Sequence, residues 1–386
     1  MPIVLYLIGF SASFADSSLI PVVPLYVSAL GISVSQAGLI VALYSYVTSL
    51  LIIPCGRLSD RVGPKRFMLA GLFVFAAGPL LYLLAKKPEY LMLVRTFHGF
   101  AFAFFLPAGF ALAGNLAPPE KKGEAMGWYT MALHIGLTLG PTTGGFVLKT
   151  FGFQAAFCVS SAVAVIGLLL ILTRVRVLHQ QHQEVVRESS IGDWFRQKPI
   201  QASLLVQFVT GFGMGNINTY VPLYCKSIGL TSVSAGLIIT ALFASSSLSR
   251  APAGRLSDSV GRKPMITWGL ILIAGAVASI SQFGSLPGLM LTGVLFGLGM
   301  GIASTATFAL VAESSSAKMM ALSMAILAFS FHFGLAVGPT SMGVAVKATG
   351  LRDMFLVCAS ILALGFFAVV GRLRSRDEPR GLKRNA

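Results

Sequence analysis

The chain has 386 residues, of which 55% are hydrophobic and only 11% are charged, and its formal net charge is +16. Soluble domains average about 45–50% apolar and about 25% charged residues, so the composition excludes an ordinary soluble protein and indicates one that crosses a membrane many times. The positive charge does not indicate a nucleic-acid partner, because the basic residues lie in short gaps between apolar runs, where membrane topology places them.

Twelve apolar runs approach or exceed the roughly 20 residues that a helix needs to span the hydrocarbon layer. In chain order they are 3–27, 35–55, 66–85, 90–116, 124–148, 153–173, 200–224, 233–253, 264–283, 287–312, 319–346 and 352–372. The sequence therefore predicts an all-α integral membrane protein of twelve transmembrane helices. We expect a six-helix bundle at 1–174, a polar central loop at 175–199, a second six-helix bundle at 200–372 and a tail at 373–386.

The distribution of basic residues predicts the orientation of these helices. With both termini in the cytoplasm, the inner gaps and the tail, counted with the residues at the run ends, hold 21 lysines and arginines, whereas the outer gaps hold 6. Cytoplasmic loops carry an excess of Lys and Arg, so we expect a multi-pass protein of the plasma (inner) membrane with both termini cytoplasmic. The first apolar run has no basic lead, which argues against a cleavable signal peptide.

The second half of the chain repeats the first at an offset of 198 residues. Gly56 and Gly254 each begin a short charged segment between two apolar runs, and the sequence Val23–Tyr26 returns as Val221–Tyr224. Because six helices separate the copies, both halves have the same orientation. This pattern indicates a parallel repeat about an axis along the membrane normal.

The charged segments resemble the loop between helices 2 and 3 of the major facilitator superfamily, and the resemblance extends over nearly the whole chain. Pro64 in the first copy and Ser259 in the second replace basic residues of that motif. Asp60 lies at a helix C-terminus, where the helix dipole disfavours an anion, so we expect it to find donors that change between transport states. The alternative is that the charges only set topology. The residues of this predicted conformational latch are Gly56, Asp60, Arg61, Gly63, Lys65, Arg66, Gly254, Asp258, Gly261, Arg262 and Lys263.

A glycine-rich stretch in the fifth run resembles the motif that characterises the drug/proton antiporters of the same superfamily, and it has an echo in the eleventh run. Glycines spaced four residues apart make a smooth face for close helix packing, and a proline permits a bend. The resemblance favours an exporter, although ordinary packing needs the same residues. The predicted packing motif comprises Gly136, Gly140, Pro141, Gly144, Gly145, Gly334, Gly338 and Pro339.

Charged residues inside apolar runs are functional candidates because hydrocarbon makes them costly. Asp16 lies roughly 20 Å from the inner boundary and Arg95 roughly 8 Å from the outer one, so both fall in the outer half of the membrane. Arg95, His98 and Gly99 are similar to the family's helix 4 motif R-xx-Q-G, with His98 in place of glutamine. The hypothesis is that Asp16 binds the coupling proton and that Arg95, when close, favours its release. A structural pair and an interfacial arginine are the alternatives.

Other polar residues are candidates for proton transfer or for the substrate cavity. His134 and His332 are repeat mates near mid-depth, and histidine titrates near neutral pH. Interhelical hydrogen bonding would explain these polar residues equally well. The substrate-cavity candidates are Ser13, Ser17, Gln207, Asn216, Asn218, Ser304 and Thr305.

Together these features predict a secondary active transporter that exports small drug-like or amphiphilic compounds in exchange for protons, by alternating access. A metabolite carrier for a sugar or an organic anion is one alternative, and a lipid flippase or a non-transporting sensor is another. Without a P-loop or a GxSxG nucleophile motif, the sequence supports neither ATP drive nor enzymatic hydrolysis. We expect no cofactor, no metal and a monomer whose partners are the substrate, protons and the bilayer.

Overall fold

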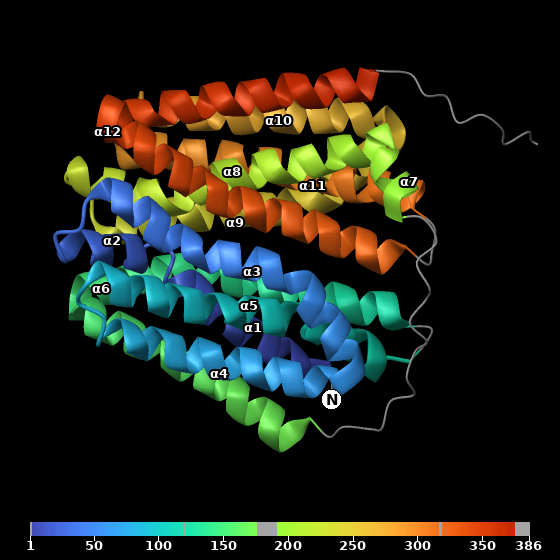
Figure 1. Ribbon diagram of the computed structural model, residues 1–386, viewed down its shortest axis with the longest axis horizontal. Helices are drawn as coiled ribbons and strands as arrows, with labels where there is room; N and C mark the ends of the chain where they lie inside the picture. The colour runs from blue at the N-terminus through green and yellow to red at the C-terminus, as the bar shows by residue number, and fades with distance from the viewer. Residues whose placement is uncertain (1, 119–120, 176–190, 316–318, 375–386) are drawn as a thin grey trace, which may run out of the picture.

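The computed structural model describes residues 2–118, 121–175, 191–315 and 319–374, so most of the predicted central loop and tail lie outside these ranges. Every element within the described ranges is an α-helix, which confirms the predicted all-α fold class (Figure 1). The helices are α1 (Pro2–Ser18), α2 (Val22–Ala29), α3 (Val34–Val62), α4 (Pro64–Tyr82), α5 (Pro88–Leu116), α6 (Lys122–Arg174), α7 (Ile191–Arg196), α8 (Lys198–Ser227), α9 (Ser232–Val260), α10 (Arg262–Ile280), α11 (Leu286–Ser314) and α12 (Met320–Arg374).

Nine helices of the described chain are long and apolar enough to cross a membrane, when α1 and α2 are taken together. Two of these, α6 and α12, turn back on themselves at Gly152 and Gly350 and so contain two crossings each. The helix α8 has 30 residues but falls outside the nine, because polar side chains such as Gln207 and Asn216 interrupt its apolar sequence. With these additions the described helices agree with the twelve predicted spans.

The backbone follows the predicted repeat closely. The six described glycines with positive φ form three pairs, Gly31 with Gly229, Gly63 with Gly261, and Gly152 with Gly350, each at the 198-residue offset. Within each pair the two φ values agree within 3°. A positive φ costs glycine little, and here it makes the turn between consecutive helices. The N-caps of α3 and α9, Ser33 and Thr231, are also repeat mates.

The charged segments are more helical than the hydropathy pattern predicts. The apolar runs end near residues 55 and 253, but α3 continues to Val62 and α9 to Val260. The connection to the next helix is a single glycine in each half, Gly63 and Gly261. Charged side chains can extend these helices because the last two turns protrude from the apolar region, where water satisfies them.

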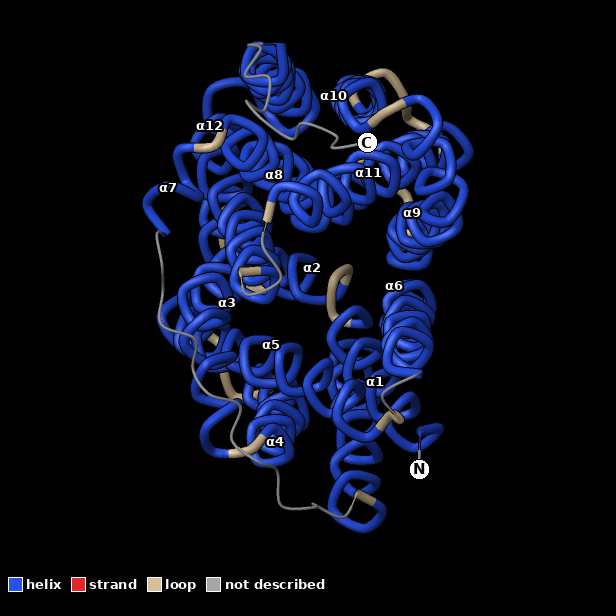
Figure 2. Tube along the Cα trace, turned by 90° about the vertical axis from the view of Figure 1, so that its right-hand side faces the viewer, coloured by secondary structure: helices blue, strands red, loops and turns tan. Residues whose placement is uncertain are grey.

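The two halves of the chain form two groups of helices that lie side by side, with α3 against α12 and α6 against α9 where they meet (Figures 1 and 2). We call the end of the molecule where α1 and α8 begin and α6 and α12 end the proximal end, and it faces the viewer in Figure 2. The opposite end, where α2 ends and α9 begins, is the distal end.

Glycine faces set the close packing within each half. A side chain on Gly136 would meet the Phe10 carbonyl of α1 at 2.6 Å, and one on Gly140 would meet the Phe14 carbonyl at 2.8 Å. In the second half, Gly338 of α12 packs in the same way on the Phe212 carbonyl of α8. The glycine motif thus brings α1 onto α6 and α8 onto α12 at backbone contact distance, which holds each half as a unit.

Candidate functional site

Five polar side chains from four helices meet inside the first half, and we call them the Asp16 cluster. They are Asp16 of α1, Tyr44 of α3, Tyr82 of α4, and Arg95 and His98 of α5. Two of the five, Tyr44 and Tyr82, are not among the residues that the sequence singled out. A cluster of this kind inside an apolar bundle is a functional candidate because each polar group there must be compensated.

Arg95 is the centre of the cluster and is buried, with 8% of its surface exposed. One terminal nitrogen donates to the Val41 carbonyl at 2.7 Å, and the other donates to the Tyr82 hydroxyl at 3.3 Å. The guanidinium carbon also lies 4.9 Å from the centre of the Tyr44 ring, a cation–π distance. These contacts hold the guanidinium in the bundle, so the observed side chain does not extend to the membrane surface.

Asp16 faces this cation through Tyr44. Its carboxyl group interacts electrostatically with Arg95 and lies beside the Tyr44 hydroxyl, which has no hydrogen bond of good geometry. The helix α1 ends two residues later, and α2 starts only at Val22. A carboxyl group at such a break can reorient more easily than one in the middle of a continuous helix.

His98 closes the cluster on the side of α4. Its Nδ1 lies 3.4 Å from the Tyr82 hydroxyl, and its ring packs edge-on against Tyr44 with the ring centres 5.4 Å apart. The other ring nitrogen, Nε2, is buried without a hydrogen-bond partner, as is the Nε of Arg95. The Tyr82 hydroxyl therefore joins the arginine to the histidine.

Close contact between α3 and α5 positions the cluster. A side chain on Gly99 would meet the Tyr44 carbonyl at 2.7 Å, and the Thr48 hydroxyl donates to the Gly99 carbonyl at 2.9 Å. The absence of a Cβ at Gly99 lets α5 approach α3 until Arg95 reaches the Val41 carbonyl. Chemically, the arrangement sets one ionisable carboxyl group beside a fixed cation, with two hydroxyls and an imidazole close by.

The sequence did not single out Tyr44 and Tyr82, although it contains a signal that marks them. Their repeat mates in the second half are Leu242 and Ile280, both aliphatic. Asp16, Arg95 and His98 likewise have the mates Met214, Gly293 and Phe296. Every member of the Asp16 cluster is thus a polar residue whose repeat mate is apolar, and this difference between the two halves is the signal in the sequence.

The two predicted histidines lie apart from the Asp16 cluster and apart from each other. In α6, the Nδ1 of His134 is 2.8 Å from the Thr130 carbonyl, and the ring is electrostatically coupled to Arg250 of α9 in the other half. His332 in α12 is buried, with its ring centre 5.3 Å from that of Phe102, again across the two halves. Both histidines therefore occupy the boundary between the halves.

The predicted cavity residues occupy several different environments. Ser17 donates to the Gly136 carbonyl at 3.0 Å, and Ser13 lies against the same glycine, so both belong to the packing of α1 on α6. In α8, Asn216 donates to Phe212 and to Cys358, while Gln207 is buried with an unpaired amide nitrogen. The remaining candidates are Asn218, which has an unpaired amide oxygen, Ser304, which is buried, and Thr305, which lies near Gly254.

The two charged segments of the predicted latch are unequal at the proximal end. Arg262 in the second copy forms ion pairs with Asp258 at 2.6 Å and with Glu313 of α11 at 2.7 Å. The repeat mates of Arg262 and Glu313 are Pro64 and Asn115, so the first copy cannot form this ion-pair network. There, Asp60 is exposed and Lys65 donates to the Val175 carbonyl at the end of α6.

The remaining residues of these segments lie in the same turns. Gly56 and Gly254 pack near Pro107 and Thr305, Gly63 and Gly261 make the connections, and Arg61 and Arg66 are exposed, as is Lys263.

The two halves are joined by direct contacts at the distal end. Thr142 of α6 donates to Thr240 of α9 at 2.8 Å, and the Thr240 hydroxyl donates on to the Thr138 carbonyl at 2.7 Å. Nearby, Ser232 donates to the Gly145 carbonyl at 2.8 Å, and Gly236 packs on the Pro141 carbonyl without room for a side chain. On the other side of the interface, Gly38 and the Pro339 carbonyl form the equivalent contact.

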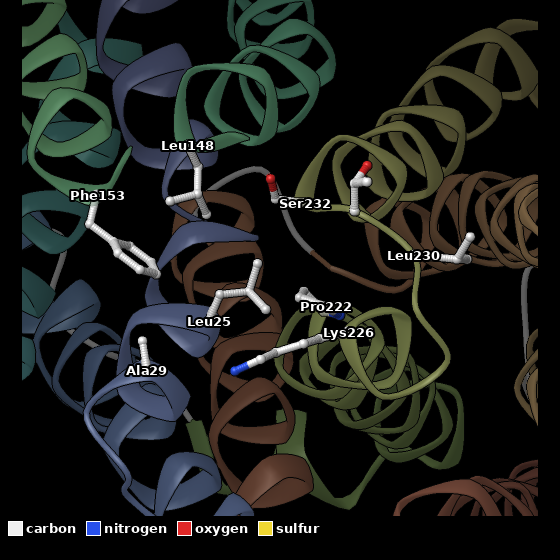
Figure 3. Close-up of a pocket in the computed structure, with 9 residues that line it drawn as sticks. Leu25, Ala29, Leu148, Phe153, Pro222, Lys226, Leu230 and Ser232 are labelled. Carbon is white, nitrogen blue, oxygen red and sulfur yellow. The ribbon is translucent and has the colours of Figure 1, made fainter. Parts of the chain in front are cut away.

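A small pocket of about 260 Å³ opens beyond this contact layer, between α2, α6, α8 and the start of α9 (Figure 3). Its walls include Leu25, Leu148 and Phe153 from the first half and Pro222 and Lys226 from the second. The Lys226 ammonium donates to Ser28 at 3.1 Å and so ties the two halves together at its rim. The contact layer beneath this pocket closes the distal end.

Comparison with known proteins agrees with this architecture. The family model of the Major Facilitator Superfamily matches residues 5–226 and 203–386. The multi-drug resistance efflux pump PmrA of Streptococcus pneumoniae is 26% identical, over 95% of this chain and 94% of the pump. An uncharacterized MFS-type transporter of Methanocaldococcus jannaschii is 22% identical over 91% and 92%. A bacterial homolog of the human lysosomal transporter Spinster, in an inward-facing conformation, superimposes with a TM-score of 0.81 at 16% identity, covering 98% of each chain.

Proposed function

The chain belongs to the major facilitator superfamily, and we propose that it exports small drug-like or amphiphilic compounds in exchange for protons. Membership makes it a multi-pass membrane transporter and not an enzyme. The similarity to PmrA, which is named as a multi-drug resistance efflux pump, supports the export of drug-like compounds. The glycine motif of α6, with its echo in α12, supports the same direction of transport.

The Asp16 cluster is the observation that supports proton coupling. A carboxyl group held inside an apolar bundle beside the buried cation Arg95 can exist with or without its proton, depending on how well the cation and water compensate it. Tyr44 stands between the two groups, and Tyr82 and His98 extend the polar chain. Proton coupling in this proposal therefore belongs to the first half of the molecule.

Alternating access gives the second part of the proposal. Because the distal end is closed and both termini are predicted to be cytoplasmic, this proposal assigns the molecule to an inward-facing or occluded state and not to an outward-facing one. Asp16 and Arg95 lie in the same half, so a rigid rotation of the halves leaves their separation unchanged. Coupling then requires either a local movement at the α1–α2 break or a change in the access of water to Asp16.

The Asp16→Asn variant tests proton coupling. We expect proton-driven transport to fall at least tenfold, because an amide of the same size cannot bind and release the proton. The measurement uses everted membrane vesicles with an imposed pH gradient and two fluorescent probes, the cation ethidium and the anion 9-anthracenecarboxylate. Binding of the transported probe to purified protein serves as a second readout and is expected to persist.

Asp353→Asn is the matched control, since this exposed carboxylate makes the same chemical change far from the cluster. Undiminished proton-driven transport by Asp16→Asn would reject the role of the cluster. Wild-type vesicles that move neither probe, even with the gradient imposed in either direction, would reject export of amphiphilic compounds.

A further inference from the structure

Arg250 is a charged residue of α9 that takes no part in the Asp16 cluster. It lies ten residues before the end of the helix at Val260, about 15 Å along the axis, and three residues before the apolar run ends at residue 253. The side chain is partly buried, and its Nε is inaccessible and without a hydrogen-bond partner. Within the described ranges the side chain forms neither a hydrogen bond nor an ion pair.

The position of Arg250 follows from the contact between α6 and α9. The pair Thr142–Thr240 joins these helices near the distal end. Measured from there toward the proximal end, His134 lies eight residues along α6, about 12 Å, and Arg250 ten residues along α9, about 15 Å. The two side chains are thus at similar depth on opposite sides of the boundary, which agrees with their electrostatic coupling.

The surroundings of α9 show that Arg250 is directed to the interior. Ser246, one turn earlier, packs against Gly301 of α11, and Gly254, one turn later, lies near Thr305 of the same helix. Leu248, on the other side of α9, is 77% exposed and marks the lipid-facing surface. Arg250 therefore points between α6 and α11, toward the boundary of the two halves and away from the lipid.

The charges inside the bundle do not balance. Over the described part of the chain, the ionic side chains at least three residues inside an apolar run are Asp16, Arg95 and Arg250. Asp16 and Arg95 compensate each other. Arg250 leaves one positive charge without a counter-ion, and a partly buried cation is unfavourable until water or an anion compensates it.

We propose that Arg250 binds the anionic group of the transported compound, so that the substrates are amphiphilic carboxylates and not permanent cations. This inference rests on the proposed transport function and specifies its substrate class. The guanidinium offers two parallel donors to a carboxylate, a bidentate geometry that an ammonium lacks. The repeat mate of Arg250 is Ile52, so the anion site exists once, in the half opposite to the Asp16 cluster.

The apolar part of such a compound also finds a suitable surface at the boundary. Phe333 of α12 faces Tyr46 of α3, with ring centres 6.2 Å apart, and His332 faces Phe102 of α5. Aromatic side chains contribute large contact areas to an apolar ligand at little entropic cost. A planar aromatic carboxylate thus matches the charge on the α6–α9 side of the boundary and the aromatic walls on its α3–α12 side.

The experiment measures equilibrium binding of two probes that share one ring system. These are 9-anthracenecarboxylate and the cation (9-anthracenylmethyl)trimethylammonium, titrated against the purified full-length protein by fluorescence. We expect the wild type to bind the carboxylate at least tenfold more tightly than the cation. Arg250→Gln should lose at least tenfold in affinity for the carboxylate while its affinity for the cation stays equal or rises.

Two further variants make the comparison specific. Arg255→Gln removes the same charge from an exposed position five residues along α9 and should bind both probes like the wild type. Arg250→Lys keeps the charge but lacks the two parallel donors, so it should retain part of the preference for the carboxylate probe. Partial retention would show that the loss in Arg250→Gln comes from the missing charge and not from misfolding. A wild type that binds the cation as tightly as the carboxylate, or that binds neither probe, overturns the inference, as does an unchanged carboxylate affinity in Arg250→Gln.

Because the assay needs no pH gradient, its result is independent of proton coupling. If carboxylate binding depends on Arg250 while Asp16→Asn transports at an undiminished rate, the anion site is supported and the coupling mechanism is rejected. The reverse combination, lost coupling in Asp16→Asn without a preference for the carboxylate, would reject the anion site alone.

Discussion

At the scale of single residues, the Tyr82 hydroxyl makes a connection that no other described group duplicates. It accepts from Arg95 at 3.3 Å and lies 3.4 Å from the Nδ1 of His98. Both partners already carry one unpaired nitrogen each, so they have little alternative bonding. Loss of the hydroxyl therefore affects the orientation of the cation that faces Asp16.

We predict that Tyr82→Phe lowers proton-driven transport about three- to tenfold and destabilises the protein by about 1–3 kcal/mol, since it leaves buried donors unpaired. Vesicle transport under an imposed pH gradient and thermal unfolding of the purified protein measure the two effects. Tyr90→Phe is the control, because this tyrosine on α5 is 55% exposed. Equal transport rates for both variants would show that the hydroxyl only fills space.

At the scale of helices, glycine contacts with carbonyl oxygens close the distal end in both pairs of facing helices. Gly236 of α9 packs on the Pro141 carbonyl of α6, and its repeat mate Gly38 of α3 packs on the Pro339 carbonyl of α12. The glycine–proline motif of α6 thus packs on α1 of its own half and on α9 of the other half. It supplies packing within a half and closure between the halves.

We predict that Gly236→Val shifts the protein away from the state with a closed distal end, because the new side chain would overlap the Pro141 carbonyl. Distances between spin labels at exposed positions 29 and 226, on the two sides of the distal pocket, should lengthen. Gly275→Val is the matched control, since a side chain there meets nothing within 4 Å. Identical distance distributions in the two variants would contradict a closing role for Gly236.

At the scale of the whole molecule, the two halves differ in chemistry although they share one fold. The first half holds the Asp16 cluster, and the second holds Arg250 and the Arg262 ion pairs. The proposed proton binding and the proposed anion binding therefore lie in opposite halves. Both sites can then influence the relative movement of the two halves. We expect the contacts at the distal end to control that movement.

We predict that a disulfide between Thr142→Cys and Thr240→Cys stops transport by holding the distal end closed. The two hydroxyls are 2.8 Å apart, so the substituted side chains lie within reach of each other. In a background with the exposed Cys158 replaced by serine, oxidation should lower the transport rate at least tenfold and reduction should restore it.

The pair Thr143→Cys and Thr240→Cys is the matched control, because Thr143 bonds back to Leu139 of its own helix. Wild-type transport by the oxidised 142–240 pair would mean that the distal end need not open during the cycle.

Much of the fold could be predicted from the sequence, because hydrocarbon thickness sets the length of an apolar run. The duplication was also readable, and the backbone repeats it down to paired glycines such as Gly63 and Gly261. The helix ends were less accurate, since the charged turns before these two glycines are helical and hydropathy alone cannot distinguish a protruding helix from a loop.

For the candidate site, the sequence by itself identified Asp16 and Arg95, because both are conspicuous in apolar runs, but it did not single out Arg250 near the end of the eighth run. Tyr44 and Tyr82 were not recognised, since a tyrosine in such a run is ordinary until its hydroxyl meets a partner. Only the tertiary structure decided that these side chains meet, that Arg250 faces the other half, and that the distal end is closed. The physical reason is that hydropathy constrains the length and depth of each helix but leaves free its rotation about its own axis and its choice of neighbours.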